Sequence, residues 1–439
     1  MNNNPLKSIG RASLLALTLT ASAFAGEQPT FLKEGKWRGE FKLNEKVLPF
    51  NFEVKGTNEE NATFSLINGT RRDHFKVKVI EGDSIFVKMN TYDAALVGKI
   101  HEDGTFRGVY KSLVPNPRFN GNRLPFVAEF GKTHRFVKED HALKPAGNIS
   151  GKWNIKIISK DPNAANSVAL LEQKGNKLTG VLMTVVGDTR ELEGNVVGDE
   201  FYLSGFSGPS PYLIQGKLGD NKKTIVEGEY NIGIYFSQKY EGSKEKNIEL
   251  PDPYKLTFLK EGYDRINFTF PDLEGKPVSI NDDKYKGKVV IVEIIGTWCP
   301  NCTDQTRFLA PWFSQNKHRG VEAIAVGFEQ KDDLEYAKYT LGKLKEFYKI
   351  EYDILFGGLA DKKIATEKFQ GLNRMAAFPT TIIFDRSGKI REIYTGYTGD
   401  ITGKYYKNYV KKFNKVLDEL IAEPNPHAGQ ALSQVGAGQ

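Results

Sequence analysis

Residues 289–302 read Val-Val-Ile-Val-Glu-Ile-Ile-Gly-Thr-Trp-Cys-Pro-Asn-Cys, and this stretch decides how the rest of the chain is interpreted. It begins with an apolar run that only Glu293 interrupts, and the run ends at Gly296. Cys299 and Cys302 follow at once, and they are the only cysteines among 439 residues. A parallel strand that is covered on both faces has such a near-continuous apolar sequence. The stretch therefore predicts a central strand followed by a turn that carries two thiols.

The spacing of the two cysteines predicts a redox pair. A disulfide between residues three apart closes a small loop and removes little entropy from the unfolded chain, so it stabilises the fold only slightly. A helix that begins near Cys299 would direct its free N–H groups and positive dipole end at this sulfur and favour the thiolate. Pro300 suits the first helical position. Because the thiolate is the attacking species in disulfide exchange, Cys299 is the predicted nucleophile and Cys302 the resolving thiol.

Two other interpretations of the cysteine pair are weaker. A zinc site needs about four ligands, but the chain has no second pair of cysteines, and His318 has no neighbouring histidine. An inert structural disulfide is disfavoured by the short loop that it would close. We therefore expect no metal ligand and no cofactor in this chain.

Several motifs resemble a known family. The motif Trp-Cys-Pro-Asn-Cys at 298–302, after a buried strand, and the later Phe-Pro-Thr at 378–380 resemble the thioredoxin fold. They are more closely similar to the TlpA/ResA-like thiol–disulfide oxidoreductases of bacterial envelopes. The lead-in Phe-Pro-Asp-Leu-Glu-Gly-Lys at 270–276 and the strand start Gly-Lys-Val-Val at 287–290 fit the same family. The resemblance covers residues 263–423.

The resemblance implies roles for the residues that surround the dithiol. Pro379 would follow a cis peptide bond and face the disulfide, and the backbone of Phe378 would pair with an extended substrate. Trp298 and Thr380 would complete the substrate-binding surface. One position departs from the family pattern, because Arg307 stands where a helix proline often occurs; Pro311 comes four residues later.

Glu293 is the most informative residue after the thiols. It lies six residues before Cys299, where thioredoxins carry a buried acid. Burial raises the pKa of a carboxyl group, so this side chain could accept and return a proton near neutral pH. We hypothesise that Glu293 relays the proton of Cys302. The alternative is a structural ion pair with Lys276 or Lys288.

Residues 1–25 have the features of an export signal. Lys7 and Arg11 precede an apolar segment at 12–21, and Ala-Phe-Ala at 23–25 precedes Gly26. The apolar segment is shorter than the roughly 20 residues of a membrane span, although an uncleaved anchor stays open as an alternative. No later stretch predicts a span. We therefore expect a periplasmic or otherwise exported protein, and a single redox pair fits such an oxidising compartment.

Composition excludes one class of partner. The net charge is +7, and the lysines are interspersed with acidic residues along the chain. A nucleic-acid-binding surface would need clustered basic residues, so no nucleic-acid partner is expected. The expected partners are protein thiols or disulfides and an upstream electron donor. The sequence does not predict the oligomeric state.

The part before the cysteine motif contains an internal repeat. Gly-Lys-Trp at 35–37 recurs at 151–153, and Gly-Asp-Ser-Ile-Phe at 82–86 recurs as Gly-Asp-Glu-Phe-Tyr at 198–202. Short alternating apolar stretches separated by turn residues predict about eight strands in each copy. Each copy is therefore an expected up-and-down barrel or sandwich.

The Gly-x-Trp motif at the first strand of each copy weakly resembles lipocalin and avidin-like small barrels. We expect Trp37 and Trp153 to be core residues, since a buried tryptophan is usually packing. A barrel that holds an apolar ligand is the alternative.

The predicted fold class is multidomain, with two repeated all-β modules followed by an α/β thioredoxin-like domain. Within the α/β domain, apolar spacing predicts a strand at 321–328, helices at 332–349, 362–369 and 404–421, and strands at 353–356, 380–384 and 390–394. A closing strand is expected at 254–259. We expect a signal at 1–25, β-modules at 26–142 and 143–262, a redox domain at 263–423, and a disordered tail at 424–439.

The predicted function is that of an exported thiol–disulfide oxidoreductase that reduces protein disulfides through its Cys-Pro-Asn-Cys dithiol. Two alternatives stay open. The first is a thiol peroxidase, which would want a Thr or Ser about one turn before the cysteine and an arginine partner, whereas Thr297 is nearly adjacent to Cys299. The second is a β-barrel ligand- or partner-binding protein with an accessory redox domain. The direction of electron flow is not encoded in these patterns, because the potential depends on how far the reduced form is stabilised.

Overall fold

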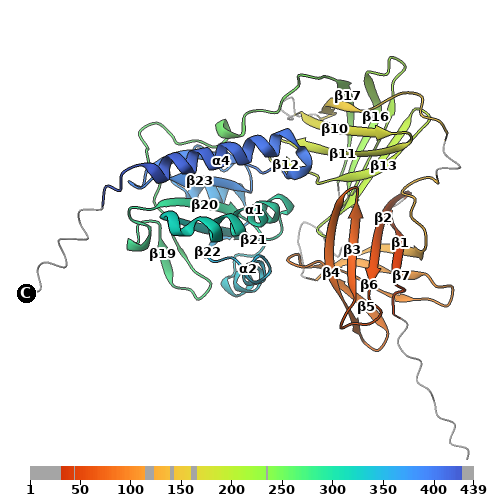
Figure 1. Cartoon of the computed structure of the whole chain (residues 1–439), viewed down its shortest axis with the longest axis horizontal. Helices are drawn as coiled ribbons and strands as arrows, with labels where there is room; N and C mark the ends of the chain where they lie inside the picture. The colour runs from red at the N-terminus through yellow and green to blue at the C-terminus, as the bar shows by residue number, and fades with distance from the viewer. Residues whose placement is uncertain are drawn as a thin grey trace, which may run out of the picture.

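The computed structural model describes residues 31–43, 45–113, 123–138, 143–159, 166–233 and 236–427. Two β-barrels stand beside an α/β domain, and the long helix α4 (Lys404–Ala422) begins close to the second barrel (Figure 1). The expected signal at 1–25 and most of the expected tail, 428–439, lie outside the described residues. Among the helices of the described part, none is long and apolar enough to cross a membrane.

The first barrel is an up-and-down ring of eight antiparallel strands. Each strand pairs with the next one along the chain, and β1 pairs with β8 to close the ring. Phenylalanine side chains from β1, β2 and β3 point inward and stack in its core. The strands are β1 (Gly35–Leu43), β2 (Lys46–Lys55), β3 (Thr63–Asn68), β4 (Arg71–Ile80), β5 (Ser84–Lys88), β6 (Ala94–Ile100), β7 (Phe106–Ser112) and β8 (Arg123–Phe130).

The second barrel repeats this topology with one addition. Pairing of β10 with β11 closes its ring, and the two-residue strand β12 extends from β11 outside the ring. The strands are β9 (Gly151–Ile157), β10 (Ser167–Lys174), β11 (Lys177–Thr184), β12 (Gly187–Asp188), β13 (Leu192–Val197), β14 (Glu200–Phe206), β15 (Pro211–Leu218), β16 (Thr224–Ile232) and β17 (Phe236–Lys244). The predicted repeat of all-β modules is confirmed, and each module is a barrel rather than a sandwich.

The two tryptophans occupy equivalent positions in the repeat. The indole N–H of Trp37 donates to the carbonyl of Lys33 at 2.9 Å, and that of Trp153 donates to the carbonyl of Ile149 at 2.7 Å. Both side chains are fully buried, as expected for core residues. The interior of the second barrel retains an apolar cavity of only about 20 Å³, lined by residues such as Phe201 and Tyr240. This volume holds about one water molecule, so the cavity has no room for a lipid or pigment.

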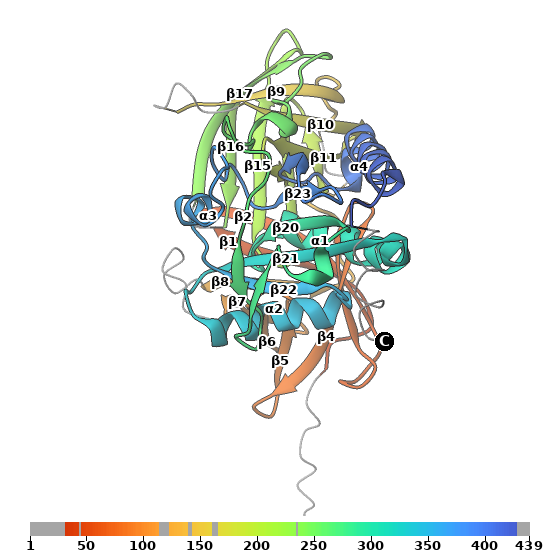
Figure 2. The same ribbon diagram turned by 90° about the vertical axis from the view of Figure 1, so that its left-hand side faces the viewer.

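The α/β domain is built on a five-stranded sheet in the order β22-β21-β20-β23-β24, which Figure 2 shows from the side of this domain. The central strand β20 (Val289–Ile295) is buried at every residue, parallel to β21 and antiparallel to β23. The other elements are β18 (Thr269–Pro271), β19 (Pro277–Ser279), α1 (Pro300–Asn316), β21 (Val321–Glu329), α2 (Leu334–Tyr348), β22 (Asp353–Leu359), α3 (Lys362–Lys368), β23 (Thr380–Phe384) and β24 (Ile390–Thr395).

Helices α1 and α4 pack against each other through aromatic side chains. Phe308 of α1 contacts Tyr409 and Phe413 of α4, and Trp312 contacts Phe413 edge to face at 5.2 Å. Helix α1 runs unbroken through Pro311. The helix that begins at the cysteines is therefore anchored along its length by the last helix of the chain.

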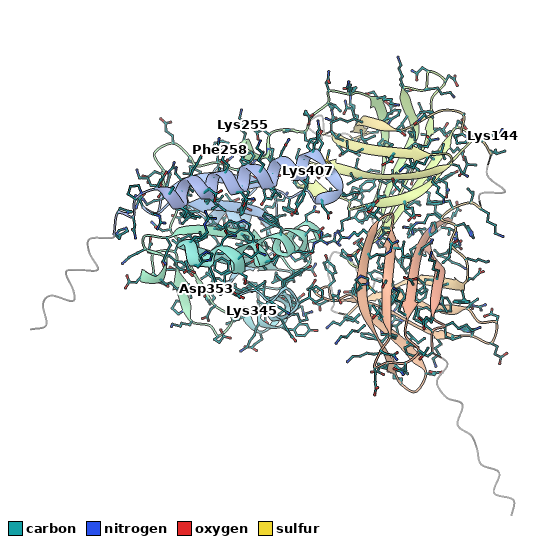
Figure 3. The ribbon with its side chains drawn as sticks, in the orientation of Figure 1. Lys144, Lys255, Phe258, Lys345, Asp353 and Lys407 are labelled. Carbon is teal, nitrogen blue, oxygen red and sulfur yellow. A yellow bond between two sulfur atoms is a disulfide. The ribbon has the colours of Figure 1, made fainter. Side chains whose placement is uncertain are left out.

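The prediction of a closing strand at 254–259 was wrong. The segment instead contains a single 3₁₀ turn at Pro253–Lys255, which Asp252 caps by accepting from the N–H of Tyr254 at 3.0 Å. Proline at the start of a turn and a capping aspartate favour this conformation over an extended strand. Phe258 then lies half-exposed at the surface near Lys255 (Figure 3), and only an isolated bridge joins Leu259 to Leu372.

A buried arginine joins the two barrels. The guanidinium of Arg135 donates to Ser204 Oγ at 2.9 Å and to Asn68 Oδ1 at 2.9 Å. Burial lowers the pKa of Arg135 to about 10. Its hydrogen bonds reach β14 of the second barrel and the end of β3 in the first, so the two rings are held by polar contacts as well as by apolar packing.

Candidate active site

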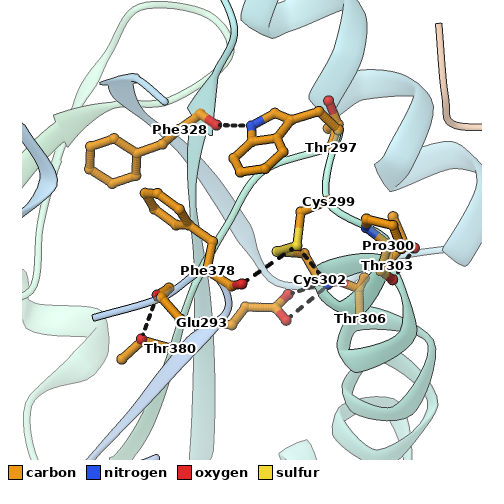
Figure 4. Close-up of a disulfide and its surroundings, with 12 residues drawn as sticks. Glu293, Thr297, Cys299, Pro300, Cys302, Thr303, Thr306, Phe328, Phe378 and Thr380 are labelled. Atoms are coloured by element: carbon orange, nitrogen blue, oxygen red, sulfur yellow. Dashed lines mark hydrogen bonds between the residues drawn. A yellow bond between two sulfur atoms is a disulfide. The ribbon is translucent and has the colours of Figure 1, made fainter. Parts of the chain in front are cut away.

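The two cysteines form a disulfide at the start of α1 (Figure 4). Their Cα atoms are 5.2 Å apart. Cys299 is the N-cap residue, and its sulfur accepts the backbone N–H of Cys302 at 3.2 Å. Pro300 occupies the first helical position, where its missing N–H costs nothing. The prediction that the helix directs its free N–H groups at the Cys299 sulfur is confirmed.

Burial distinguishes the two sulfurs. Cys299 is 5 % exposed and Cys302 is 1 % exposed. Cys299 therefore lies nearer the surface, and Cys302 lies one turn inside the helix. This difference matches the predicted division between an attacking and a resolving thiol, although the roles themselves stay predictions.

A cis proline lies opposite the disulfide. The Phe378–Pro379 peptide bond is cis, as the resemblance implied. The carbonyl oxygen of Phe378 is 3.6 Å from the sulfur of Cys299, and the carbonyl of Pro379 accepts the N–H of Gly396 at 2.7 Å. The cysteine turn, the proline turn and the turn after β24 thus meet at one edge of the sheet.

Trp298 and Thr380 are placed differently around this edge. The partly exposed indole of Trp298 donates to the carbonyl of Phe328 at 2.9 Å and contacts the ring of Phe378 edge to face. Thr380 is fully buried, and its hydroxyl donates to the carbonyl of Ala377 at 2.8 Å. Thr380 thus stabilises the proline turn from inside, and substrate contact by this residue stays a prediction.

Glu293 lies in the centre of β20, and its carboxylate points toward α1 (Figure 4). It is fully buried and accepts hydrogen bonds from Tyr352 Oη at 2.6 Å and Thr306 Oγ1 at 3.3 Å. Desolvation raises its pKa to about 7, and the two hydroxyl hydrogen bonds reduce that shift. Its partners are hydroxyl groups, so the alternative of an ion pair with Lys276 or Lys288 is wrong.

Glu329 is a second buried acid, which the sequence interpretation missed. It ends β21, next to the cysteine turn, and accepts from Thr297 N at 2.9 Å and Thr297 Oγ1 at 2.7 Å. Burial raises the pKa of Glu329 to about 7, opposed by these hydrogen bonds. An acid at the end of the strand that neighbours β20 was the available signal, because sites gather at the carboxyl ends of parallel strands.

Side chains from the barrels also reach this site. Arg190, which follows β12 in the second barrel, donates from Nε to Asp304 Oδ2 at 2.7 Å and from Nη2 to the carbonyl of Pro300 at 2.9 Å. Arg71 of the first barrel is 3.3 Å from Asp304 Oδ1. Because Pro300 lies between the two cysteines, the barrels contact the redox motif itself.

Comparison with known proteins agrees with this geometry. A family model described as the AhpC/TSA family matches residues 262–393. The chain is 31 % identical over 189 residues to the thiol-disulfide oxidoreductase ResA of Bacillus cereus (strain ATCC 10987 / NRS 248), a match that covers 43 % of this chain and 90 % of that protein. The chain belongs to the ResA family of thiol–disulfide oxidoreductases. The ResA of Bacillus subtilis (strain 168) is 25 % identical over 153 residues, covering 35 % of this chain and 77 % of that protein.

Two solved structures are also similar to part of this chain. The thioredoxin domain of thiol-disulfide oxidoreductase BVU-2223 from Bacteroides vulgatus is 26 % identical and matches 36 % of this chain and 99 % of its own length, with a TM-score of 0.27. A thiol:disulfide interchange protein of the thioredoxin family from Chlorobium tepidum TLS is 17 % identical over 37 % of this chain and 99 % of its own, with a TM-score of 0.28. Because the family model matches residues 262–393, the likeness lies in the C-terminal part of the chain, and the enzyme class is thiol–disulfide oxidoreductase.

Replacing Glu293 with glutamine should change the pH dependence of stability. The folded-state pKa of Glu293, about 7, lies above the ordinary value of 4.5 for a glutamate, so stability that is present below pH 4.5 is lost as the pH rises through 7. At 1.36 kcal/mol for each pH unit, we expect Glu293→Gln to be more stable than wild type by roughly 3 kcal/mol at pH 8.

Chemical denaturation of the oxidised protein at pH 4.5, 6 and 8, followed by circular dichroism, measures this difference. The difference should shrink toward zero at pH 4.5. Glu367→Gln, an exposed acid on α3, is the matched control and should change stability little at any of these pH values. Equal stability of wild type and Glu293→Gln at pH 8 would contradict the assignment of a costly buried carboxylate.

Proposed function

We propose that this chain reduces disulfides in other proteins through Cys299 and Cys302. In the reduced chain, the thiolate of Cys299 attacks a substrate disulfide and releases one substrate thiolate. Cys302 then attacks the mixed disulfide, releases the second substrate thiol and leaves the Cys299–Cys302 disulfide. Two electrons thus pass to the substrate, and an upstream dithiol donor must return them. The observation that carries this proposal is the helix N–H aimed at the Cys299 sulfur beside a cis proline.

Phe378, Pro379 and Trp298 would present the substrate. An extended segment that pairs with the backbone of Phe378 would lie beside Cys299, because the Phe378 carbonyl is 3.6 Å from that sulfur. The partly exposed indole of Trp298 would supply apolar contact area. Thr380 would act from beneath by fixing the turn that carries Pro379.

Serine substitutions separate the two thiols. Cys302→Ser should accumulate a mixed disulfide with a reducible protein such as insulin, because no resolving thiol remains. Cys299→Ser should form no mixed disulfide and should no longer accelerate the reduction of insulin by dithiothreitol. Non-reducing electrophoresis and insulin turbidity measure both outcomes. Reduction at the wild-type rate by Cys299→Ser would refute the proposal and favour a β-barrel ligand- or partner-binding protein with an accessory redox domain.

The thiol peroxidase alternative is tested in the same preparation. The Thr297 hydroxyl already donates its hydrogen bond to Glu329 beneath the cysteine turn, so it is not directed at a peroxide beside Cys299. We therefore expect hydrogen peroxide consumption with dithiothreitol to stay at the level of Cys299→Ser. Rapid peroxide consumption by wild type alone would favour the peroxidase.

Glu293 would accept the proton that Cys302 loses when it attacks the mixed disulfide. Its hydrogen bond to Thr306 places the carboxylate beneath the α1 turn that follows Cys302. A carboxyl group with a pKa near 7 can take a proton at neutral pH and return it later. The reaction would therefore speed up as the pH rises through about 7.

Glu293→Gln should slow disulfide exchange most near pH 7, on the order of 10²-fold, and approach wild type by pH 9, where thiols ionise without help. Stopped-flow exchange rates across pH 6–9 measure this. Tyr352→Phe is the matched variant: it removes a hydrogen bond that lowers the Glu293 pKa, so the midpoint of the rate profile should move to higher pH. Wild-type rates across this range in Glu293→Gln would refute the relay.

We propose in addition that residues 1–25 direct export and that the mature chain comprises modules 26–142 and 143–262 and the redox domain 263–423. The charged, apolar and small-residue segments at the N-terminus support this. Full-length protein expressed in a bacterium should appear in the periplasmic fraction with an N-terminus at Gly26. A chain without residues 1–25 should stay in the cytoplasm, and an uncut N-terminus in the membrane fraction would favour an uncleaved anchor.

A further inference from the structure

The second barrel extends a short strand onto the redox site. Gly187 of β12 forms a parallel bridge with Tyr397, in the turn after β24, and Asp188 Oδ2 accepts the N–H of Gly399 at 2.6 Å. On its other side lies the side-chain amide of Asn301; in the amide orientation that satisfies both of its ends, it donates to the Asp188 carbonyl at 3.1 Å and accepts the Asp188 N–H at 3.3 Å. β12 therefore lies between the Cys-Pro-Asn-Cys motif and the turn that neighbours Pro379.

Arg190 follows this strand and is almost fully buried. Its guanidinium donates to Asp304 and to the Pro300 carbonyl, as described above, and Nη2 also lies 3.1 Å from Thr303 Oγ1. All three partners belong to the first turn and a half of α1. One side chain of the second barrel thus binds the helix segment that carries both cysteines.

The first barrel supports the same contact. Tyr92 Oη is 2.9 Å from Arg190 Nη2 and 2.7 Å from Thr303 Oγ1. Arg190 Nη1 donates to the carbonyl of Ser207 at 3.3 Å. The planar guanidinium therefore has partners on every nitrogen, an arrangement that the single ammonium of lysine cannot reproduce.

The charges around Arg190 are mixed. The cations are Arg71, Arg72, Arg307 and Arg190, and the anions are Asp304, Asp73, Asp188, Glu191 and Asp400; they contact one another or line the same pocket of about 390 Å³. Arg190 is the cation that bonds directly to the backbone of the cysteine motif. Its charge is buried and poorly screened by solvent; Asp304 compensates it at Nε, while Nη2 bonds to the cysteine motif.

We propose that Arg190 is a positioning residue of the redox site: it fixes the Pro300 carbonyl and the first turn of α1, and its buried charge stabilises the thiolate of Cys299. The inference rests on the proposed role of Cys299 as the attacking thiol. A nearby opposite charge favours the ionised form of a group. Because a stabilised thiolate stabilises the reduced state, Arg190 also raises the reduction potential of the couple. The second barrel is therefore a part of the redox site.

Two substitutions in the full-length chain separate the charge from the geometry. Arg190→Gln removes the charge, and Arg190→Lys keeps it while losing the planar fork. Equilibration with glutathione measures the redox equilibrium constant. In this reaction the protein dithiol and one oxidised glutathione give the protein disulfide and two reduced glutathiones. We expect Arg190→Gln to shift this equilibrium about tenfold toward the protein disulfide, or about 30 mV, and Arg190→Lys to shift it less than threefold.

The pH profile of Cys299 alkylation by iodoacetamide gives a second readout. In Arg190→Gln the apparent pKa of the thiol should rise by about one unit, the counterpart of a tenfold change in thiolate stability. Arg135→Gln is the matched control, because Arg135 is also buried and hydrogen-bonded between modules but contacts Ser204 and Asn68 rather than α1. It should leave both the equilibrium and the alkylation profile unchanged.

The proposal is overturned if folded Arg190→Gln keeps the wild-type equilibrium and alkylation profile, or if Arg135→Gln shifts them equally. Should Arg190→Gln fail to fold, nuclear magnetic resonance of the wild-type chain decides. The Nε–H signal of Arg190 should move between the oxidised and reduced protein while that of Arg135 stays in place; a stationary Arg190 signal refutes the proposal. Failure of the proposed function is distinct, since no mixed disulfide would then form with Cys302→Ser.

Discussion

The hydrogen bond from the backbone N–H of Cys302 to the sulfur of Cys299 is the interaction on which the site depends. It exists because α1 begins at Pro300, one short turn after the central strand β20 ends at Ile295. A helix start leaves N–H groups without intrahelical acceptors, and here one of them meets a sulfur. The remaining features of the site, the cis proline, the buried acids and the barrel contacts, are arranged around this helix start.

Much of this arrangement could be predicted because it is local in sequence. The apolar run of β20 and the Cys-Pro-Asn-Cys motif specify a strand, a turn and a helix within fourteen residues. The cis bond before Pro379 followed from a short motif that resembles the family. The repeated Gly-Lys-Trp motif likewise indicated two barrels, and in the structure each tryptophan lies in the first strand of its barrel and donates to the carbonyl four residues before it.

The parts that could not be predicted depend on contacts between distant segments. Arg190 and Asp304 belong to different domains, and nothing in either local sequence distinguishes them from solvated surface charges. Their burial follows from how the barrels dock against α1. Glu293 was predicted as buried, but its hydroxyl partners Tyr352 and Thr306 come from other elements, so an ion pair with lysine was an equally reasonable expectation.

The position of β12 has a steric consequence for partners. Its bridge to Tyr397 and the contact of Asp188 with Gly399 already occupy the backbone of the turn beside Pro379. In the proposed mode of substrate binding, a polypeptide that approaches the disulfide would therefore lie along the flank formed by Trp298 and Phe378. Under that proposal, one-sided access would favour a protruding loop or chain end over a broad, flat surface, and the barrels would restrict the shapes of protein that exchange electrons with this dithiol.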